Sequence, residues 1–108
     1  MRQQLPEQRR ESRIHNHISG TVSPINNSDD LHIAALRDMN TLGAFFYSNM
    51  QAQLGDGFAL QMVLPDSNDG RRLKISCEGV VVRIEAGYDG IARGFAVQFS
   101  RYDISWVH

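Results

Sequence analysis

The residues best suited to bind an anion are three arginines near the start of the chain, Arg9, Arg10 and Arg13. A guanidinium group forms two parallel hydrogen bonds with a phosphate, and it can also bond the O6 and N7 edge of guanine. A nucleotide is therefore a chemically reasonable ligand for this segment. Arginine-rich termini are also often simply solvated, so the segment alone does not decide between a site and a solvated end.

A second polar group, made of Asp38, Asn40 and Gly43, falls in the expected connection between two strands. The carboxylate of an aspartate accepts hydrogen bonds such as those that N1 and N2 of guanine donate. The glycine would let the backbone turn with a positive φ and approach a ligand closely. The same composition is typical of an ordinary turn, so this group is also ambiguous when taken alone.

The elements that must position these residues are short strands, because apolar and polar residues alternate between clusters of turn-forming residues. The segment 31–38 also fits one face of a helix, but its shortness favours a strand. Six antiparallel strands joined by short turns favour a small closed β-barrel over an open sheet with exposed edges. The predicted strands cover roughly residues 16–22, 31–38, 43–48, 58–64, 71–85 and 94–100.

The longest predicted strand, residues 71–85, would pair with the strand before it across a turn over residues 65–70. Its alternate residues from Leu73 to Arg83 share one face if no bulge intervenes, and its length predicts a bend near Gly79. We expect a flexible arginine-rich arm over residues 1–15, an all-β barrel over 16–103 and a C-terminal tail over 104–108.

The composition narrows the functional classes. Eleven basic and twelve acidic side chains give a net charge of -1, which argues against general binding to nucleic acid or membranes. No apolar run approaches the ~20 residues that span a bilayer, and the polar start of the chain is not a secretory signal. The single cysteine, Cys77, looks like a small core residue and fits a reducing cytoplasm. We expect no enzyme, since no catalytic triad, carboxylate pair or phosphate-binding loop is present, and no metal site, since His15 and His17 lack further ligands.

Taken together, the two polar motifs resemble the paired signature of the PilZ domain family, RxxxR followed by [D/N]xSxxG. Arg9 and Arg13 match the first motif, and Asp38, Asn40 and Gly43 match the second in the same order and at a similar separation. One position departs from the family pattern, because Asn40 stands where the family has a serine.

The resemblance extends to residues 78–84 and 94–99, which look like the last two barrel strands of the family. It implies a cytoplasmic bacterial receptor for cyclic di-GMP, with this ligand and no other cofactor. Arg9 and Arg13 would clamp its phosphates and guanine edges with Arg10 as an auxiliary contact, while Asp38, Asn40 and Gly43 would shape the barrel half of the site. Ligand binding would order the arm and signal through a protein effector.

Two alternatives remain open from the sequence. A ligand-independent PilZ-like protein-interaction module is favoured by Asn40 and by the apolar residues near the end of the chain, 102–108. A small barrel that binds nucleic acid would use Phe45, Phe46 and Tyr47 to stack on bases, but the near-neutral charge argues against it.

Overall fold

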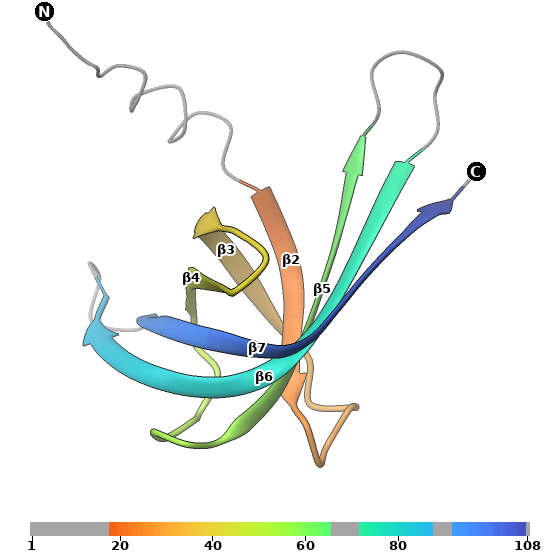
Figure 1. The fold of residues 1–108 in the computed structure, drawn as a ribbon. Helices are drawn as coiled ribbons and strands as arrows, with labels where there is room; N and C mark the ends of the chain where they lie inside the picture. The colour runs from red at the N-terminus through yellow and green to blue at the C-terminus, as the bar shows by residue number, and fades with distance from the viewer. Residues whose placement is uncertain (1–17, 66–71, 88–91, 108) are drawn as a thin grey trace, which may run out of the picture.

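The computed structural model describes residues 18–65, 72–87 and 92–107, so the predictions for the N-terminal arm lie outside the described residues. The described part is all-β, and its six strands form one closed antiparallel barrel in the order β2-β3-β4-β7-β6-β5 (Figure 1). The predicted barrel is confirmed. The strands are β2 (Ile18–Pro24), β3 (His32–Met39), β4 (Gly43–Ser48), β5 (Gly57–Pro65), β6 (Arg72–Ala86) and β7 (Arg93–Val107).

The core fills the barrel with apolar side chains from all six strands. Three phenylalanine rings are fully buried there, and the ring centroid of Phe46 lies 6.4 Å from that of Phe58 and 5.7 Å from that of Phe95. Cys77 is 2% exposed and belongs to the same core, as predicted. Burial raises the pKa of its thiol to about 11, and nearby Asp103 adds to this effect.

Two register shifts bend the long β6–β7 pair. The first, between Glu78 and Gly79, confirms the predicted bend, and a Cβ on Gly79 would collide with the backbone carbonyl of Gln98. The second, between Val81 and Arg83, turns Arg83 to the outside of the barrel. The predicted common face of Leu73 and Arg83 required that no bulge intervene, and this condition fails here, because one extra residue reverses the faces of the strand beyond it.

Strand β7 is longer than predicted, because β6 offers it a partner as far as Arg72, which pairs with Val107. The segment from residue 104, predicted as a tail, lies in this strand up to Val107. Residues 59–65 of β5, 72–78 of β6 and 101–107 of β7 pair in this order, and we call these three segments the projecting ribbon. Because β2 pairs with β5 as far as Met62, the ribbon leaves the barrel only beyond that residue (Figure 1).

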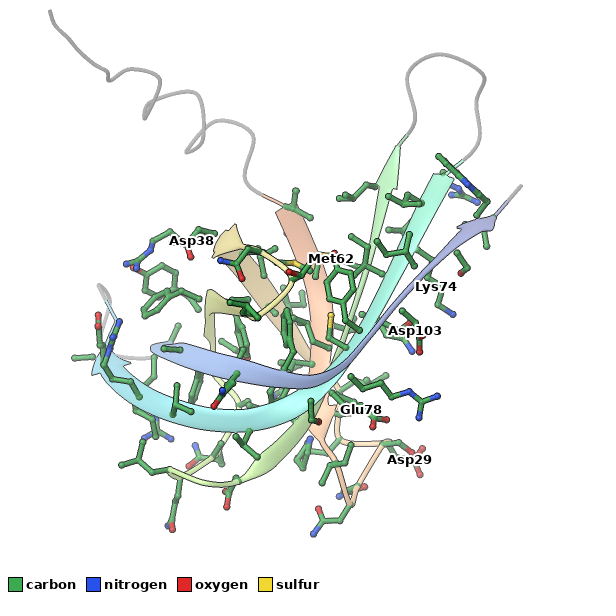
Figure 2. The ribbon with its side chains drawn as sticks, viewed as in Figure 1. Asp29, Asp38, Met62, Lys74, Glu78 and Asp103 are labelled. Carbon is green, nitrogen blue, oxygen red and sulfur yellow. The ribbon has the colours of Figure 1, made fainter. Side chains whose placement is uncertain are left out.

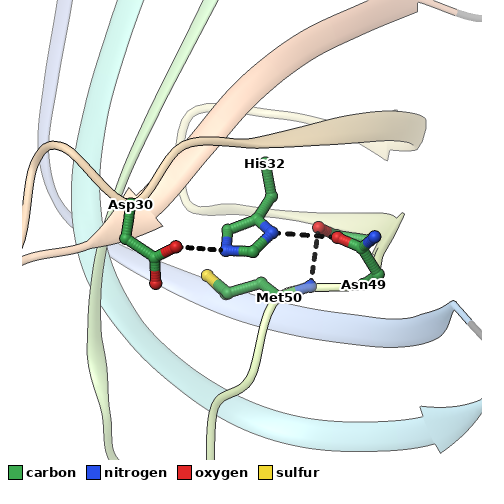
Figure 3. Close-up of polar contacts among 5 residues, drawn as sticks. Asp30, His32, Asn49 and Met50 are labelled. Atoms are coloured by element: carbon green, nitrogen blue, oxygen red, sulfur yellow. Dashed lines mark hydrogen bonds and ion pairs between the residues drawn. The ribbon is translucent and has the colours of Figure 1, made fainter.

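A polar contact network fixes the connection between β2 and β3. Nε2 of His32 lies 2.9 Å from Oδ1 of Asp30, and Nδ1 of His32 lies 2.9 Å from Oδ1 of Asn49 (Figure 3). The backbone N–H of Met50 donates to Oγ of Ser48 at 3.1 Å. His32 thus ties the β2–β3 loop to the segment that follows β4.

Candidate functional site

Asn40 organises the turn between β3 and β4. Its Oδ1 accepts hydrogen bonds from the backbone N–H of Leu42 at 2.8 Å and of Gly43 at 3.1 Å. Its own N–H donates to the carbonyl of Gly43 at 2.9 Å. A serine hydroxyl can accept the same kind of backbone hydrogen bond, so Asn40 preserves this turn chemistry. In the part of the chain that the structure describes, its Nδ2 makes no hydrogen bond and is available as a donor.

The same turn is fixed to β7. The carbonyl of Leu42 accepts the backbone N–H of Phe99 at 2.8 Å. Gly43 does not have the predicted positive φ, which among the described glycines belongs to Gly55. The physical requirement at Gly43 is space, because a Cβ there would overlap the backbone carbonyl of Val97. Gly43 therefore lets β4 approach β7 closely.

A row of four paired residues crosses the outer face beside this turn. Asp38 of β3 pairs with Phe45 of β4, Phe45 with Ala96 of β7, and Ala96 with Arg83 of β6. Asp38 thus lies within β3, as the predicted strand over residues 31–38 has it, directly after the register shift that follows Leu36. Of the three motif residues, only Asn40 lies in the connection between the strands. The small side chain of Ala96 leaves room between Phe45 and Arg83.

Phe45 faces outward but is only 3% exposed. Its neighbours in sequence, Ala44 and Phe46, belong to the core, so the alternation of the strand directs Phe45 to the other face. Cζ of Arg37 lies 3.7 Å from the Phe45 ring centroid, and Cζ of Arg83 lies 5.9 Å from it. These cation–π contacts cover the ring. Neither Phe45 nor Phe46 is accessible for stacking on nucleic acid bases.

Arg37 is held by acidic and aromatic partners. Its Nε lies 3.3 Å from Oδ2 of Asp38, and both side chains are about half exposed. Burial alone would lower the pKa of Arg37, but hydrogen bonds with Tyr47 and Asp38 outweigh it and raise the pKa above its ordinary value. On the far side of Phe45, Nε of Arg83 lies 3.0 Å from Oε2 of Glu85. Arg37 therefore remains a cation at a fixed place.

These residues surround a shallow hollow of ≈ 360 Å³ on the outside of the barrel. Asp38, one of its lining residues, lies at the outer side of the end of β3 (Figure 2). The hollow brings together the three predicted barrel-side residues, whereas Arg9, Arg10 and Arg13 lie outside the described residues. Its lining includes Arg37, Asp38, Asn40, Gly43, Arg83 and Gln98.

Two members of this site, Arg37 and Arg83, were not predicted from the sequence. Arg37 directly precedes the second motif, which is the one signal that could have identified it. Two guanidinium groups, one carboxylate and one free amide donor suit a polar, anionic ligand with donors of its own. Within residues 18–65, 72–87 and 92–107 there is no group of acidic, histidine or cysteine side chains that could hold a metal ion. The same residues contain no helix long and apolar enough to cross a membrane.

The chain matches a known protein family. A family model of the PilZ domain matches residues 7–105, which include both polar motifs and all six strands apart from the last residues of β7. We found no significant match to the chain among curated proteins or among solved structures.

Proposed function

The chain belongs to the PilZ domain family, and from this premise we propose that it is a receptor for cyclic di-GMP that binds the ligand at the hollow beside the β3–β4 turn. PilZ domains are binding modules and generally not enzymes. The observation that carries the proposal is the placement of Asp38 between a fixed arginine and a polar turn on the outer face.

Each group in the hollow has a chemical counterpart on the ligand. The carboxylate of Asp38 can accept hydrogen bonds from N1–H and N2–H of guanine. The guanidinium groups of Arg37 and Arg83 can contact phosphate oxygens or the O6 and N7 edge of the base. The Nδ2 of Asn40, which makes no hydrogen bond among the described residues, can donate where the family uses a serine hydroxyl. The Asn40 substitution is therefore compatible with binding.

The first motif would complete the site from the N-terminal arm. Arg9 and Arg13, with Arg10 as an auxiliary contact, would bind the phosphates and the remaining guanine edge. The ligand would order the arm over the barrel, and the new contacts would offset the entropy lost by the arm. In this mechanism the ordered arm presents a new surface to a protein effector in the cytoplasm.

Calorimetric titration with cyclic di-GMP tests the proposal. We expect saturable binding that weakens at least tenfold in the double variant Arg9→Ala/Arg13→Ala, because each charge-assisted hydrogen bond contributes roughly 1.5–3 kcal/mol. Arg72→Ala, which removes an exposed arginine far from the hollow along β6, should bind like the wild type. No heat above background at high micromolar ligand would overturn the proposal.

The choice of base provides a second control. Adenine lacks the N1–H and N2–H donors of guanine, so the hydrogen bonds to Asp38 cannot form with cyclic di-AMP. We expect cyclic di-AMP to bind about ten- to a hundredfold more weakly than cyclic di-GMP. Equal affinity for the two ligands would show that the carboxylate does not recognise the base.

The second candidate function is a ligand-independent protein-interaction module. It is favoured by the exposed apolar side chains near the end of β7, Ile104 at 51% and Trp106 at 49%. This alternative predicts that the Arg9→Ala/Arg13→Ala variant retains its partner in a pull-down, whereas the receptor should lose its ligand-dependent capture.

A further inference from the structure

The first half of strand β7 lies between two other strands, whereas its second half lies at the edge of the sheet formed by the described strands. Residues 93–98 pair with β4 on one side and with β6 on the other, whereas residues 101–107 pair with β6 alone among the six described strands. No other strand in the described part of the chain pairs with the second edge of residues 101–107. This edge borders the projecting ribbon (Figure 1). Such an edge is a template for pairing with another chain.

The inner face of the projecting ribbon continues the barrel core as far as this edge. On β5 and β6, Met62 is 3% and Ile75 is 5% exposed, but their neighbour on β7, Ile104, is 51% exposed. The apolar face therefore ends abruptly at β7. Its rows across the three strands are Leu60–Cys77–Tyr102, Met62–Ile75–Ile104 and Leu64–Leu73–Trp106.

We propose that the chain forms a homodimer in which residues 101–107 pair, antiparallel, with the same residues of a second copy about a two-fold axis at Ile104. Ile104 then faces Ile104 of the second copy, and Tyr102 faces Trp106 of that copy. The two inner faces join into one apolar surface across a sheet that is continuous between the two copies. Cross-strand aromatic and β-branched pairs of this kind stabilise antiparallel strands.

On the outer face, Nε of Arg101 lies 3.3 Å from Oδ2 of Asp103 within the chain, and the dimer would bring a second cation, Lys74 of the other copy, toward this carboxylate. Lys74 pairs with Ser105 within the chain, and Ser105 would lie opposite Asp103 of the second copy. Two strand spacings separate Lys74 from that aspartate, roughly 10 Å between Cα atoms, and a lysine side chain can cross the short serine to reach it. Lys74 and Asp103 project on the same side of the ribbon (Figure 2). Because the dimer is two-fold symmetric, the contact between Lys74 of one copy and Asp103 of the other occurs twice.

Other registers are less favourable. An axis at Asp103 places the two Asp103 carboxylates opposite each other, and like charges in that position are destabilising. An axis at Tyr102 brings Ile104 opposite Ser100, which lies at a register shift, and leaves Trp106 unpaired with the second copy. An axis at Ser105 pairs only residues 103–107. An axis between residues would place inner-face side chains opposite outer-face ones. The axis at Ile104 uses the whole edge.

Charge-swap variants test the dimer by light scattering during size exclusion. The wild type should have twice the chain mass at high micromolar concentration, whereas Ile104→Lys and Ile104→Glu should each be monomers because like charges meet at the axis. An equimolar mixture of the two variants should restore the dimer mass. Val82→Lys is the matched control, since Val82 is 50% exposed on β6 outside the ribbon, and it should remain dimeric. A monomeric wild type, or dimeric Ile104→Lys alone, would overturn the proposal.

A cross-link provides an independent readout in the folded protein. Cβ atoms directly opposite on antiparallel strands lie roughly 4.5–5.5 Å apart, close to disulfide range. Ile104→Cys should form a disulfide-linked dimer under mild oxidation, and Val82→Cys should not. Cys77 is buried and should remain reduced in both variants. Equal cross-linking of the two variants would overturn the proposal. The dimer does not depend on the proposed ligand.

Discussion

Replacement of Asn40 by alanine should weaken the β3–β4 turn, because it removes the acceptor of two backbone hydrogen bonds, from Leu42 and Gly43. A net contribution of about 0.5–1.5 kcal/mol per hydrogen bond applies to such pairs, and the lower half of that range suits an exposed turn. The expected loss in the free energy of unfolding is therefore about 1–2 kcal/mol. For a domain of this size this corresponds to a fall in Tm of roughly 4–9 °C.

Asn40→Ser separates the loss of the acceptor from a mere change in volume. The serine hydroxyl can accept at least one of the two hydrogen bonds, so the expected loss is about half that of the alanine variant. Asn26→Ala is the matched control, because Asn26 is exposed in the β2–β3 loop and makes no side-chain hydrogen bond within the described residues. Its Tm should equal that of the wild type.

The Tm of each of the three variants can be measured by circular dichroism during heating. A Tm of Asn40→Ala within about 1 °C of the wild type would show that the two hydrogen bonds do not stabilise the turn, and so would a Tm of Asn40→Ser below that of Asn40→Ala. In the proposed receptor, Asn40→Ser should keep its affinity for cyclic di-GMP within about tenfold, because it exchanges one hydrogen-bond donor for another. A larger loss would show that the amide makes a contact that a hydroxyl cannot replace.

Three further changes give distinct results. Gly43→Ala should lower the free energy of unfolding in urea by about 1–3 kcal/mol, because its Cβ meets the fixed carbonyl of Val97; an unchanged midpoint would contradict the close approach. Phe45→Leu should lower the free energy of unfolding by about 1 kcal/mol or more. This loss should be smaller when Arg37 is already alanine, because the cation–π contact is then absent. A double-mutant cycle without coupling between the two positions would refute the contact. The pKa of the Cys77 thiol is about 11 in the folded protein and 9.0 in the unfolded chain. The unfolded chain therefore loses this proton first as the pH rises, and the free energy of unfolding that is present below pH 9 should be lost between pH 9 and 11. This loss is roughly 3 kcal/mol at most, and Cys77→Ala should show a flatter pH dependence over that window; parallel curves would contradict the assignment.

Most of the barrel could be predicted from the sequence because its strands alternate and their turns have clear compositions. β4 begins and ends at the predicted residues, Gly43 and Ser48. The end of β7 was missed because the alternation that runs through Phe95, Val97 and Phe99 changes phase at Ser100, where the pairing with β6 shifts by one residue. Tyr102, Ile104 and Trp106 resume the alternation beyond the shift, and β6 supplies a partner for the backbone there.

The site could be predicted only in part, for a reason of register. Asp38, Asn40 and Gly43 are close in sequence, so one motif identifies them together. Arg37 and Arg83 lie far apart in the chain and meet over Phe45 only because shifts occur beside both arginines. A shift of a single residue moves a side chain to the opposite face of a sheet, and neither shift has a signal in the residue types.

The groups in the barrel half of the proposed site are held by contacts with the backbone and the core. The hydrogen bonds of Asn40, the contact of Leu42 with Phe99 and the Phe45 ring beneath Arg37 all fix its groups through the backbone or core. The entropic cost of binding would then fall almost entirely on the arm that carries Arg9 and Arg13. Substitutions of Phe45, which lies beneath Arg37, should therefore alter only the affinity for cyclic di-GMP. Substitutions in the arm should alter both this affinity and the surface offered to an effector.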